Sequence, residues 1–148
     1  MLKEDILKLY QRELLVLENE LMRYQNESII WEIAPGITNS AGNLTFHLCG
    51  NIRHFIGQVL GGSTYVRQRD LEFSGKPVSL KLLLKLIEST AEEMKHGFVQ
   101  IDNLEDKYPV LFLNEEHTIG YMLTHLFGHL QYHIGQINYH RRLVQKNG

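Results

Sequence analysis

The most restrictive feature of the chain is a run of apolar residues spaced alternately three and four positions apart. Between residues 6 and 24, with no glycine or proline in the way, the run consists of Leu7, Tyr10, Leu14, Leu17, Leu21 and Tyr24. Because an α-helix has about 3.6 residues per turn, these side chains share one face. We therefore expect a long amphipathic helix that packs on the rest of the chain. Its other faces are expected to be solvated, and they carry Glu13, Glu18, Glu20 and Arg23.

Three further segments repeat this helical periodicity, over residues 40–60, 79–101 and 118–144. Ser40 stands at the start of the second segment, where a hydroxyl side chain caps a helix well. Glycine, proline and polar residues mark the connections between the segments. The connection over residues 61–78 exceeds the roughly two to eight residues usual between bundle helices, which leaves room for a crossover. The sequence therefore predicts an all-α fold, a four-helix bundle with a long second connection.

The connections contain features of their own. Trp31 can line the mouth of a pocket, but a buried loop anchor is the simpler expectation. Residues 108–113 are β-prone, and Pro109 argues against a central strand. The second connection mixes charges of both signs, and we expect an ion-paired loop there rather than a site for a polar substrate. These charged residues are Arg67, Arg69, Asp70 and Glu72.

Size and composition exclude several classes of protein. The 148 residues are enough for one domain with its own core, which we expect to span residues 1–148. A net charge of −2 gives no electrostatic reason to bind nucleic acid. The single cysteine, Cys49, excludes an internal disulfide and a multi-cysteine zinc site, and we expect it to be a small core residue. Without a secretory signal or about 18 consecutive apolar residues, we expect no membrane span and a cytoplasmic protein.

Three histidines in the last predicted helix point to chemistry. His125, His129 and His133 are four positions apart, and residues at this spacing stack on one helix face. His129 and His133 can therefore direct both imidazoles at one point, with His125 one turn before them. Imidazoles on a largely apolar face need partners for their lone pairs, and a divalent metal ion supplies one. The alternative is a histidine-rich helix whose rings form hydrogen bonds within the fold.

A metal site needs more than this pair. Catalytic zinc sites usually have three protein ligands and one open position. The second predicted helix offers His47 or His54 as the third ligand, seven residues apart on nearly the same face. A fourth ligand such as His125 or His54 would close the site. Asn51 and Gln136 are near in helical phase and can orient ligands or substrate.

Other catalytic motifs are missing. Leu130 follows His129, so the chain lacks the His-Glu-x-x-His motif of metalloproteases. It also lacks the nucleophile elbow of serine hydrolases, the P-loop and the dinucleotide-binding glycines. Glu93 and His96 match the Glu-x-x-His spacing of di-iron bundles, but this spacing occurs once and His96 is expected to face outward. We treat that match as chance.

Two segments resemble a known family. Residues 47–56 contain His-Leu-Cys-Gly-Asn-Ile-Arg-His-Phe-Ile, and residues 125–137 contain His-Leu-Phe-Gly-His-Leu-Gln-Tyr-His-Ile-Gly-Gln-Ile. The chain thereby resembles the DinB/YfiT-like superfamily of bacterial metal-dependent enzymes. Residues 69–73, Arg-Asp-Leu-Glu-Phe, also resemble a loop motif of one branch. One departure is Ile134, because relatives often have an arginine after the last histidine, and its loss removes a polar contact from the site.

The resemblance implies a four-helix bundle with one divalent ion, commonly zinc or nickel, held by three histidines. By position these are His47, His129 and His133. It also implies a homodimer and a small-molecule substrate. Relatives include S-transferases that add a low-molecular-weight thiol to an electrophile, and a thiol-dependent isomerase. Two hypotheses follow: a metal-dependent S-transferase or related hydrolase, and a non-catalytic metal-binding or structural bundle protein. No residue is assigned a catalytic role from the sequence.

Overall fold

The regular structure is helical throughout the part of the chain that the computed structural model describes, residues 2–145. Two isolated β-bridges in that part join loop residues. The expected all-α class is therefore confirmed. The helical segments are α1 (Lys3–Met22), the 3₁₀ helix η1 (Glu27–Trp31), α2 (Ala41–Ile52), the π-helical η2 (Arg53–Gln58), α3 (Arg69–Ser74), α4 (Leu80–Val99) and α5 (Ile119–Val144).

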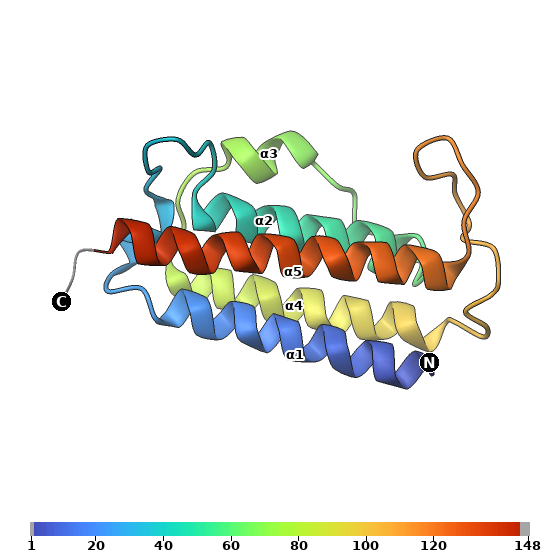
Figure 1. Cartoon of the computed structure of the whole chain (residues 1–148). Helices are drawn as coiled ribbons and strands as arrows, with labels where there is room; N and C mark the ends of the chain where they lie inside the picture. Colours follow the sequence, from blue (N-terminus) through green and yellow to red (C-terminus); the bar gives the residue numbers. More distant parts are fainter. Residues whose placement is uncertain (1, 146–148) are drawn as a thin grey trace.

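Four long helical rods lie side by side, and η2 continues the rod of α2 (Figure 1). Around the assembly, α1 packs on α4 and α5, and α2 packs on the same two helices. The chain colours in Figure 1 show α2 and α4 running in one direction and α1 and α5 in the other. The long second connection therefore returns the chain to its starting end, so that α4 is the parallel neighbour of α2.

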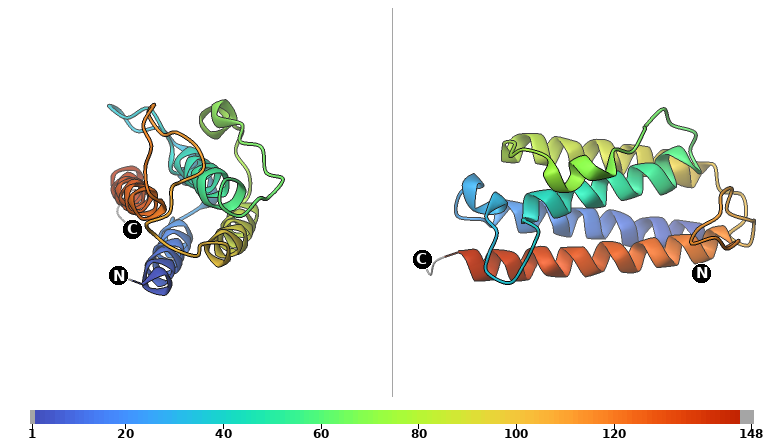
Figure 2. Two further views of the ribbon diagram at one scale, coloured as in Figure 1. Left: turned by 90° about the vertical axis from the view of Figure 1, so that its right-hand side faces the viewer. Right: turned by 90° about the horizontal axis from the view of Figure 1, so that it is seen from above.

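The short helix α3 lies outside the four rods (Figure 2). It packs on α2 and belongs to the long connection between α2 and α4. This helix was not expected from the sequence, which predicted an ion-paired loop there. Its position brings polar side chains of the connection next to α2, on the side where α2 carries His47.

Three of the helices begin where a hydroxyl side chain caps them. Ser40, Ser79 and Thr118 each accept a hydrogen bond from the backbone N–H three residues later. Such a cap satisfies one of the N–H groups that the first helical turn leaves without a partner. The predicted starts of these helices are confirmed. The first helix begins at Lys3, earlier than the predicted residue 6, and its end at Met22 is close to the predicted one.

The apolar face of α1 packs in the core as expected, but two of its charged residues are buried as well. Tyr10, Leu14, Leu17 and Leu21 are buried, but the stripe was also expected to leave every charged residue of α1 solvated. That expectation is wrong for Glu20, which is 7% exposed, and for Glu13, which is 8% exposed. Glu20 faces α5, where its carboxylate accepts hydrogen bonds from Arg141 Nε at 3.0 Å and from Asn138 Nδ2 at 2.8 Å.

The second rod does not keep α-helical hydrogen bonds to its end. Over Arg53–Gln58 the backbone forms π-helical bonds, such as Val59 N–H to the His54 carbonyl. The Phe55 carbonyl accepts a hydrogen bond of 2.7 Å from the hydroxyl of Tyr108. The helix thus extends about as far as predicted, but its last turns have a different register.

Glycines let this π-helical segment approach α4 closely. A Cβ on Gly97 would lie 2.3 Å from the Ile56 carbonyl oxygen. A Cβ on Gly61 would lie 3.1 Å from the Gly97 backbone. Any larger residue at Gly97 would force the two backbones apart, which fixes the distance between η2 and α4.

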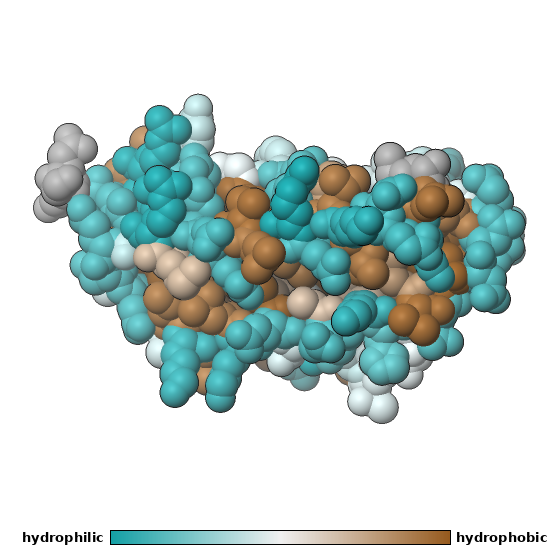
Figure 3. Space-filling view, turned by 90° about the horizontal axis from the view of Figure 1, so that it is seen from below, coloured by the Kyte–Doolittle hydropathy of each residue, from teal (hydrophilic) through white to brown (hydrophobic). Residues whose placement is uncertain are grey.

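The connections follow most of the expectations. Trp31 packs on Phe46 with ring centroids 5.3 Å apart, and a Cβ on Gly42 would meet its ring at 2.5 Å, so Trp31 is the expected loop anchor. Residues 108–113 form an isolated bridge rather than a strand, ending in a turn where Leu113 and Asn114 have positive φ. On the face that includes α1, hydrophobic residues are interspersed with hydrophilic ones (Figure 3). No helix within residues 2–145 is long and apolar enough to cross a membrane.

Candidate metal centre

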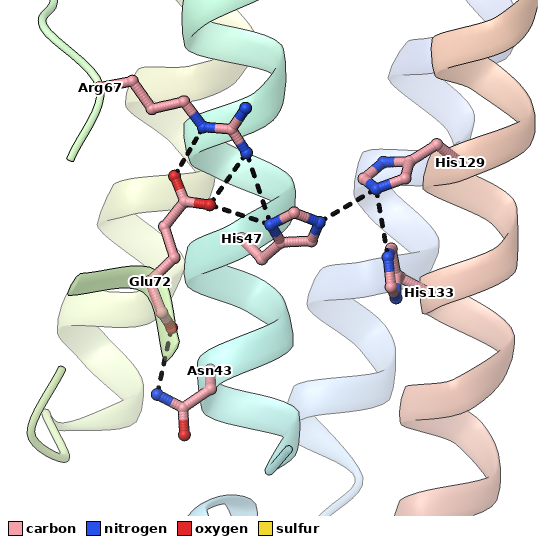
Figure 4. A network of polar contacts seen from close by, with 6 residues as sticks. All are labelled: Asn43, His47, Arg67, Glu72, His129 and His133. Atoms are coloured by element: carbon pink, nitrogen blue, oxygen red, sulfur yellow. Dashed lines mark hydrogen bonds and ion pairs between the residues drawn. The ribbon is translucent and has the colours of Figure 1, made fainter. Parts of the chain in front are cut away.

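Three histidines from two helices converge at one point. His47 lies in the second turn of α2, and His129 and His133 lie in the middle of α5 (Figure 4). The Nε2 atom of His129 is 3.0 Å from Nε2 of His47 and 3.2 Å from Nε2 of His133. One ring nitrogen of each residue lies within 4.8 Å of the other two. Helical spacing explains the pair on α5, and the packing of α2 on α5 brings the third ring to it.

A carboxylate and a guanidinium lie behind His47. The Nδ1 atom of His47 is 2.9 Å from Oε1 of Glu72 on α3. Arg67 donates two hydrogen bonds to the same carboxylate, from Nε at 2.8 Å and from Nη2 at 2.9 Å. Figure 4 shows the chain of contacts from Arg67 through Glu72 to His47. Because Glu72 is only 5% exposed, water competes little with these contacts.

The other two histidines have weaker support. The Nδ1 atom of His133 lies 2.7 Å from Oε1 of Gln136, one turn further along α5. The Nδ1 atom of His129 is buried and has no hydrogen-bond partner among the described residues. The His47 ring is thus held by an anionic acceptor, the His133 ring by a neutral amide acceptor, and the outer nitrogen of His129 by packing alone.

These partners determine where the ring protons lie. A carboxylate accepts and an amide oxygen accepts, so Nδ1–H donates in both His47 and His133. Arg67 Nη2 also lies 3.4 Å from Nδ1 of His47, and the shorter contact with Glu72 decides the proton position. Nε2 of His47 and Nε2 of His133 therefore both present a lone pair to His129.

Three imidazoles in this arrangement fit a divalent metal ion. His129 has one ring proton, so it cannot donate to both neighbouring lone pairs with a full hydrogen bond. If the proton lies on the buried Nδ1, three lone pairs face one another. Zinc and related ions accept neutral imidazole nitrogens in this way, and three such ligands leave a coordination position open. Within residues 2–145 the cluster comprises these three residues.

Burial keeps the rings of His129 and His133 neutral at neutral pH. Burial and the nearby His133 and His47 lower the pKa of His129 to about 4. Burial also lowers the pKa of His133. For Glu72, burial acts to raise the pKa, but hydrogen bonds from His47 and Arg67 outweigh it, so the pKa is lowered and the carboxylate is ionised at neutral pH. Neutral imidazoles are the form in which histidine binds a metal.

The alternative ligands named from the sequence do not join the cluster. His54 lies next to Phe55, and seven residues of helix place it about 10 Å along the axis from His47. His125 stands between the rings of Phe112 and Tyr121. The structure therefore leaves His47 as the partner of the α5 pair.

Other residues named from the sequence have various positions. Gln136 contacts His133, as expected for a residue that orients a ligand. Asn51 is buried on α2, one turn after His47. Ile134 is part of the hydrophobic core, so the position after His133 faces the interior of the fold. The side chain of Cys49 is buried and burial raises the pKa of its thiol to about 12, which excludes it as a nucleophile at neutral pH.

Sequence reasoning missed the contact between Glu72 and His47. The expected ion pair of the second connection is confirmed for Arg67 and Glu72, but its role next to the histidine was not predicted. The loop motif at residues 69–73 was the available signal. Phe73 of that motif also packs on the His47 ring, with centroids 4.9 Å apart.

Two cavities are each lined by one residue that contacts a histidine of the cluster, although no histidine of the cluster lines either of them. One, of about 400 Å³, includes Gln136 in its wall and is otherwise formed by the first connection and the last turns of α5. Its lining residues are Gly36, Ile37, Thr38, Asn39, Leu44, Gln136, Tyr139, His140 and Leu143. The other, of about 340 Å³, includes Glu72 and Gly50 and lies between the second connection and α2.

Comparison with known proteins gives a family and no function. A family model described as a protein of unknown function (DUF1572) matches residues 3–148. No curated protein matches the chain.

Proposed function

Because the chain belongs to the DUF1572 family, whose function is unknown, we propose a function from its own residues. The protein is a metal-dependent enzyme with a four-helix bundle of the DinB/YfiT-like type. His47, His129 and His133 hold one divalent cation, zinc or nickel. The observation that supports this most is the convergence of their ring nitrogens within 4.8 Å, with two lone pairs fixed toward the third ring.

The proposed reaction is transfer of a low-molecular-weight thiol to a small electrophile, or a related hydrolysis. A divalent cation with an open position is a Lewis acid that lowers the pKa of a thiol or a water molecule. In the transfer, a carbon–sulfur bond forms and the bond from that carbon to its leaving group breaks. The leaving group takes the electron pair, and the thiol proton goes to solvent. A homodimer is part of the same proposal, on the ground of the resemblance.

The cavity next to Gln136 supports a partly apolar substrate. None of its lining residues is Asp, Glu, Lys or Arg. Ile37, Leu44 and Leu143 supply apolar surface, and Gln136 joins this wall to the histidine cluster. An uncharged, partly apolar group of the electrophile therefore suits this cavity.

Metal content of the untagged protein is the first test. We expect about one zinc or nickel per chain in the wild type, and a His133→Ala variant that folds but retains little metal. His125→Ala is the matched control, because it removes a histidine of the same helix that lies outside the cluster. A wild type that is free of metal and takes up neither zinc nor nickel would contradict the proposal.

Activity is tested next with metal-loaded protein. We expect consumption of a thiol in the presence of an epoxide or haloalkane, lost in His133→Ala and retained in His125→Ala. The spectrum of the cobalt-substituted protein separates three protein ligands from four. Turnover of neither thiol nor ester, together with a four-ligand spectrum, would favour the non-catalytic metal-binding protein instead.

A further inference from the structure

The three histidines of the centre differ in what holds the nitrogen that faces away from it. His47 has the buried carboxylate of Glu72, His133 has the amide of Gln136, and His129 has no partner within the described residues. A carboxylate fixes a histidine tautomer more firmly than an amide and makes the opposite nitrogen a stronger donor to a metal. The support of His47 is therefore the strongest of the three.

The carboxylate of Glu72 lies directly against Gly50, where no residue with a side chain would leave room for it. A Cβ on Gly50 would lie 2.0 Å from Oε2 and 2.7 Å from Cδ of Glu72. Gly50 is in the last turn of α2, inside the rod that η2 continues, where alanine is favoured over glycine by about 1 kcal/mol, so helix stability gives no reason for glycine at this position. The absence of a side chain there lets Glu72 reach His47.

One segment of the chain supplies both the carboxylate and its counterion. Arg67 and Glu72 are five residues apart in the long connection, and their side chains are 13% and 6% exposed. The guanidinium forms two hydrogen bonds with the carboxylate and so orients it as well as neutralising it. Asn43 of α2 also holds Glu72 in place, because its side-chain amide donates a hydrogen bond of 3.1 Å to the Glu72 backbone carbonyl.

From these contacts we infer that Glu72 is a positioning residue for the metal centre. Its carboxylate lies against Gly50 and is held by Arg67. The carboxylate keeps His47 in the Nδ1–H tautomer, so the Nε2 lone pair of His47 points at the metal. The helix α3, which packs on α2, brings that carboxylate to His47. The inference rests on the proposed metal site, and it assigns a function to residues that the histidine pattern does not include.

The tautomer is tested first on metal-free protein. Long-range ¹H–¹⁵N spectra of the imidazoles distinguish a protonated ring nitrogen from one with a lone pair. At pH about 8, where free histidine with a pKa of about 6.5 is neutral, we expect His47 in the wild type to carry its proton on Nδ1. In Glu72→Ala we expect a mixture of the two tautomers. A wild-type His47 protonated on Nε2 would overturn the inference.

Zinc affinity is tested next, by competition with a chromogenic chelator. We expect Glu72→Ala to weaken zinc binding by about 10- to 100-fold, the range typical for the loss of such a partner. Glu72→Gln retains an oxygen that accepts from Nδ1–H, so it should restore part of the affinity. A merely structural role of the ion pair would give the two variants the same affinity.

Gly50→Ala tests the same idea without removing any polar group. Its methyl group displaces the carboxylate, because Glu72 has a flexible end and the helix does not. We expect Gly50→Ala to lose about as much zinc affinity as Glu72→Ala. The test therefore stands even if Glu72→Ala folds poorly because Arg67 has lost its partner. Gly128→Ala on α5 is the matched control, since a Cβ there meets nothing within 4 Å. Glu93→Gln is the second control, because it breaks the Arg53–Glu93 ion pair away from the histidines.

The possible results separate the inference from the proposed function. If the wild type binds zinc and both Glu72→Ala and Gly50→Ala bind it as tightly as the two controls, the inference is wrong and the metal site stands. If the wild type binds no zinc, both are wrong. Weaker binding in Glu72→Ala and Gly50→Ala alone supports both.

Discussion

The partners of each ring nitrogen separate the histidines into two kinds. His140 is 3% exposed, and both of its nitrogens are satisfied within the fold. Its Nε2–H donates to the Glu32 carbonyl at 2.7 Å, so its Nδ1 accepts from the Tyr24 hydroxyl at 2.6 Å. His129 is the opposite case, with one nitrogen facing two other histidines and the other without a partner in the described part of the chain. The first kind stabilises the fold, and the second could hold a metal ion.

The buried His140 predicts how stability depends on pH. Burial lowers its pKa below the ordinary value of 6.5, more than the Glu32 carbonyl raises it. The unfolded chain therefore binds a proton at this residue before the folded chain does. Its contribution to stability is complete above pH 6.5 and is lost as the pH falls below that value. We expect metal-free protein to have a lower Tm at pH 5.5 than at pH 7.5.

A variant assigns this loss to His140. In His140→Gln the difference in Tm between pH 7.5 and pH 5.5 should be smaller than in the wild type, because one titrating group has been removed. His96→Gln is the control, since His96 is an exposed histidine of α4. The same difference in all three proteins would contradict the assignment.

At the scale of elements, local patterns could be predicted and distant partners could not. The periodicity of the apolar residues and the hydroxyl caps, such as Ser40, depend on residues within one or two turns, and they predicted where the four long helices lie. The α5 histidine pair has the same local origin. Glu72 and His47 are 25 residues apart in the sequence, and their contact depends on the space left by the missing side chain of Gly50. No spacing rule could therefore predict it. The π-helical turns of η2 depend likewise on their packing against α4.

Glu20 shows the same limit in the core. Its partner Arg141 is 121 residues away, and their side chains are 9% and 10% exposed. Helical periodicity placed Glu20 beside the apolar stripe but could not show that a guanidinium from α5 covers it. The pair joins α1 to α5, the helix that carries two of the three histidines.

Loss of this ion pair should be costly. Glu20→Ala leaves the buried Arg141 without its carboxylate, and breaking a buried pair from one side typically costs about 3 kcal/mol or more. We expect a reduction of that size in the free energy of unfolding, measured by urea denaturation of metal-free protein. Glu18→Ala removes a carboxylate from the same helix and should change it by less than about 0.5 kcal/mol. Equal stability of the two variants would show that Arg141 finds another partner.

At the scale of the molecule, the centre links two rods that are distant in the sequence. His47 and His129 are 82 residues apart, and the ion at their meeting point would connect α2 to α5. A ligand that binds only the folded state adds to its stability, by about 2.7 kcal/mol at a free concentration of 100 Kd.

Metal should therefore raise the melting temperature. For a chain of this size, we expect an increase of roughly 5–10 °C with saturating zinc or nickel, measured by differential scanning calorimetry. His133→Ala should show no such increase, and His125→Ala should behave as the wild type does. An increase that persists in His133→Ala would mean that the stabilising ion binds elsewhere.

The separation of the ligands in the sequence also sets the order of events during synthesis. At roughly 5–20 residues per second, a ribosome makes His129 about 4–16 s after His47. Throughout that interval the first ligand is present and the other two do not yet exist. A metal ion held by all three histidines thus cannot guide any folding that occurs before α5 has been made. The complete set of histidines forms only when α5 lies against α2, so such a centre would be a product of that packing.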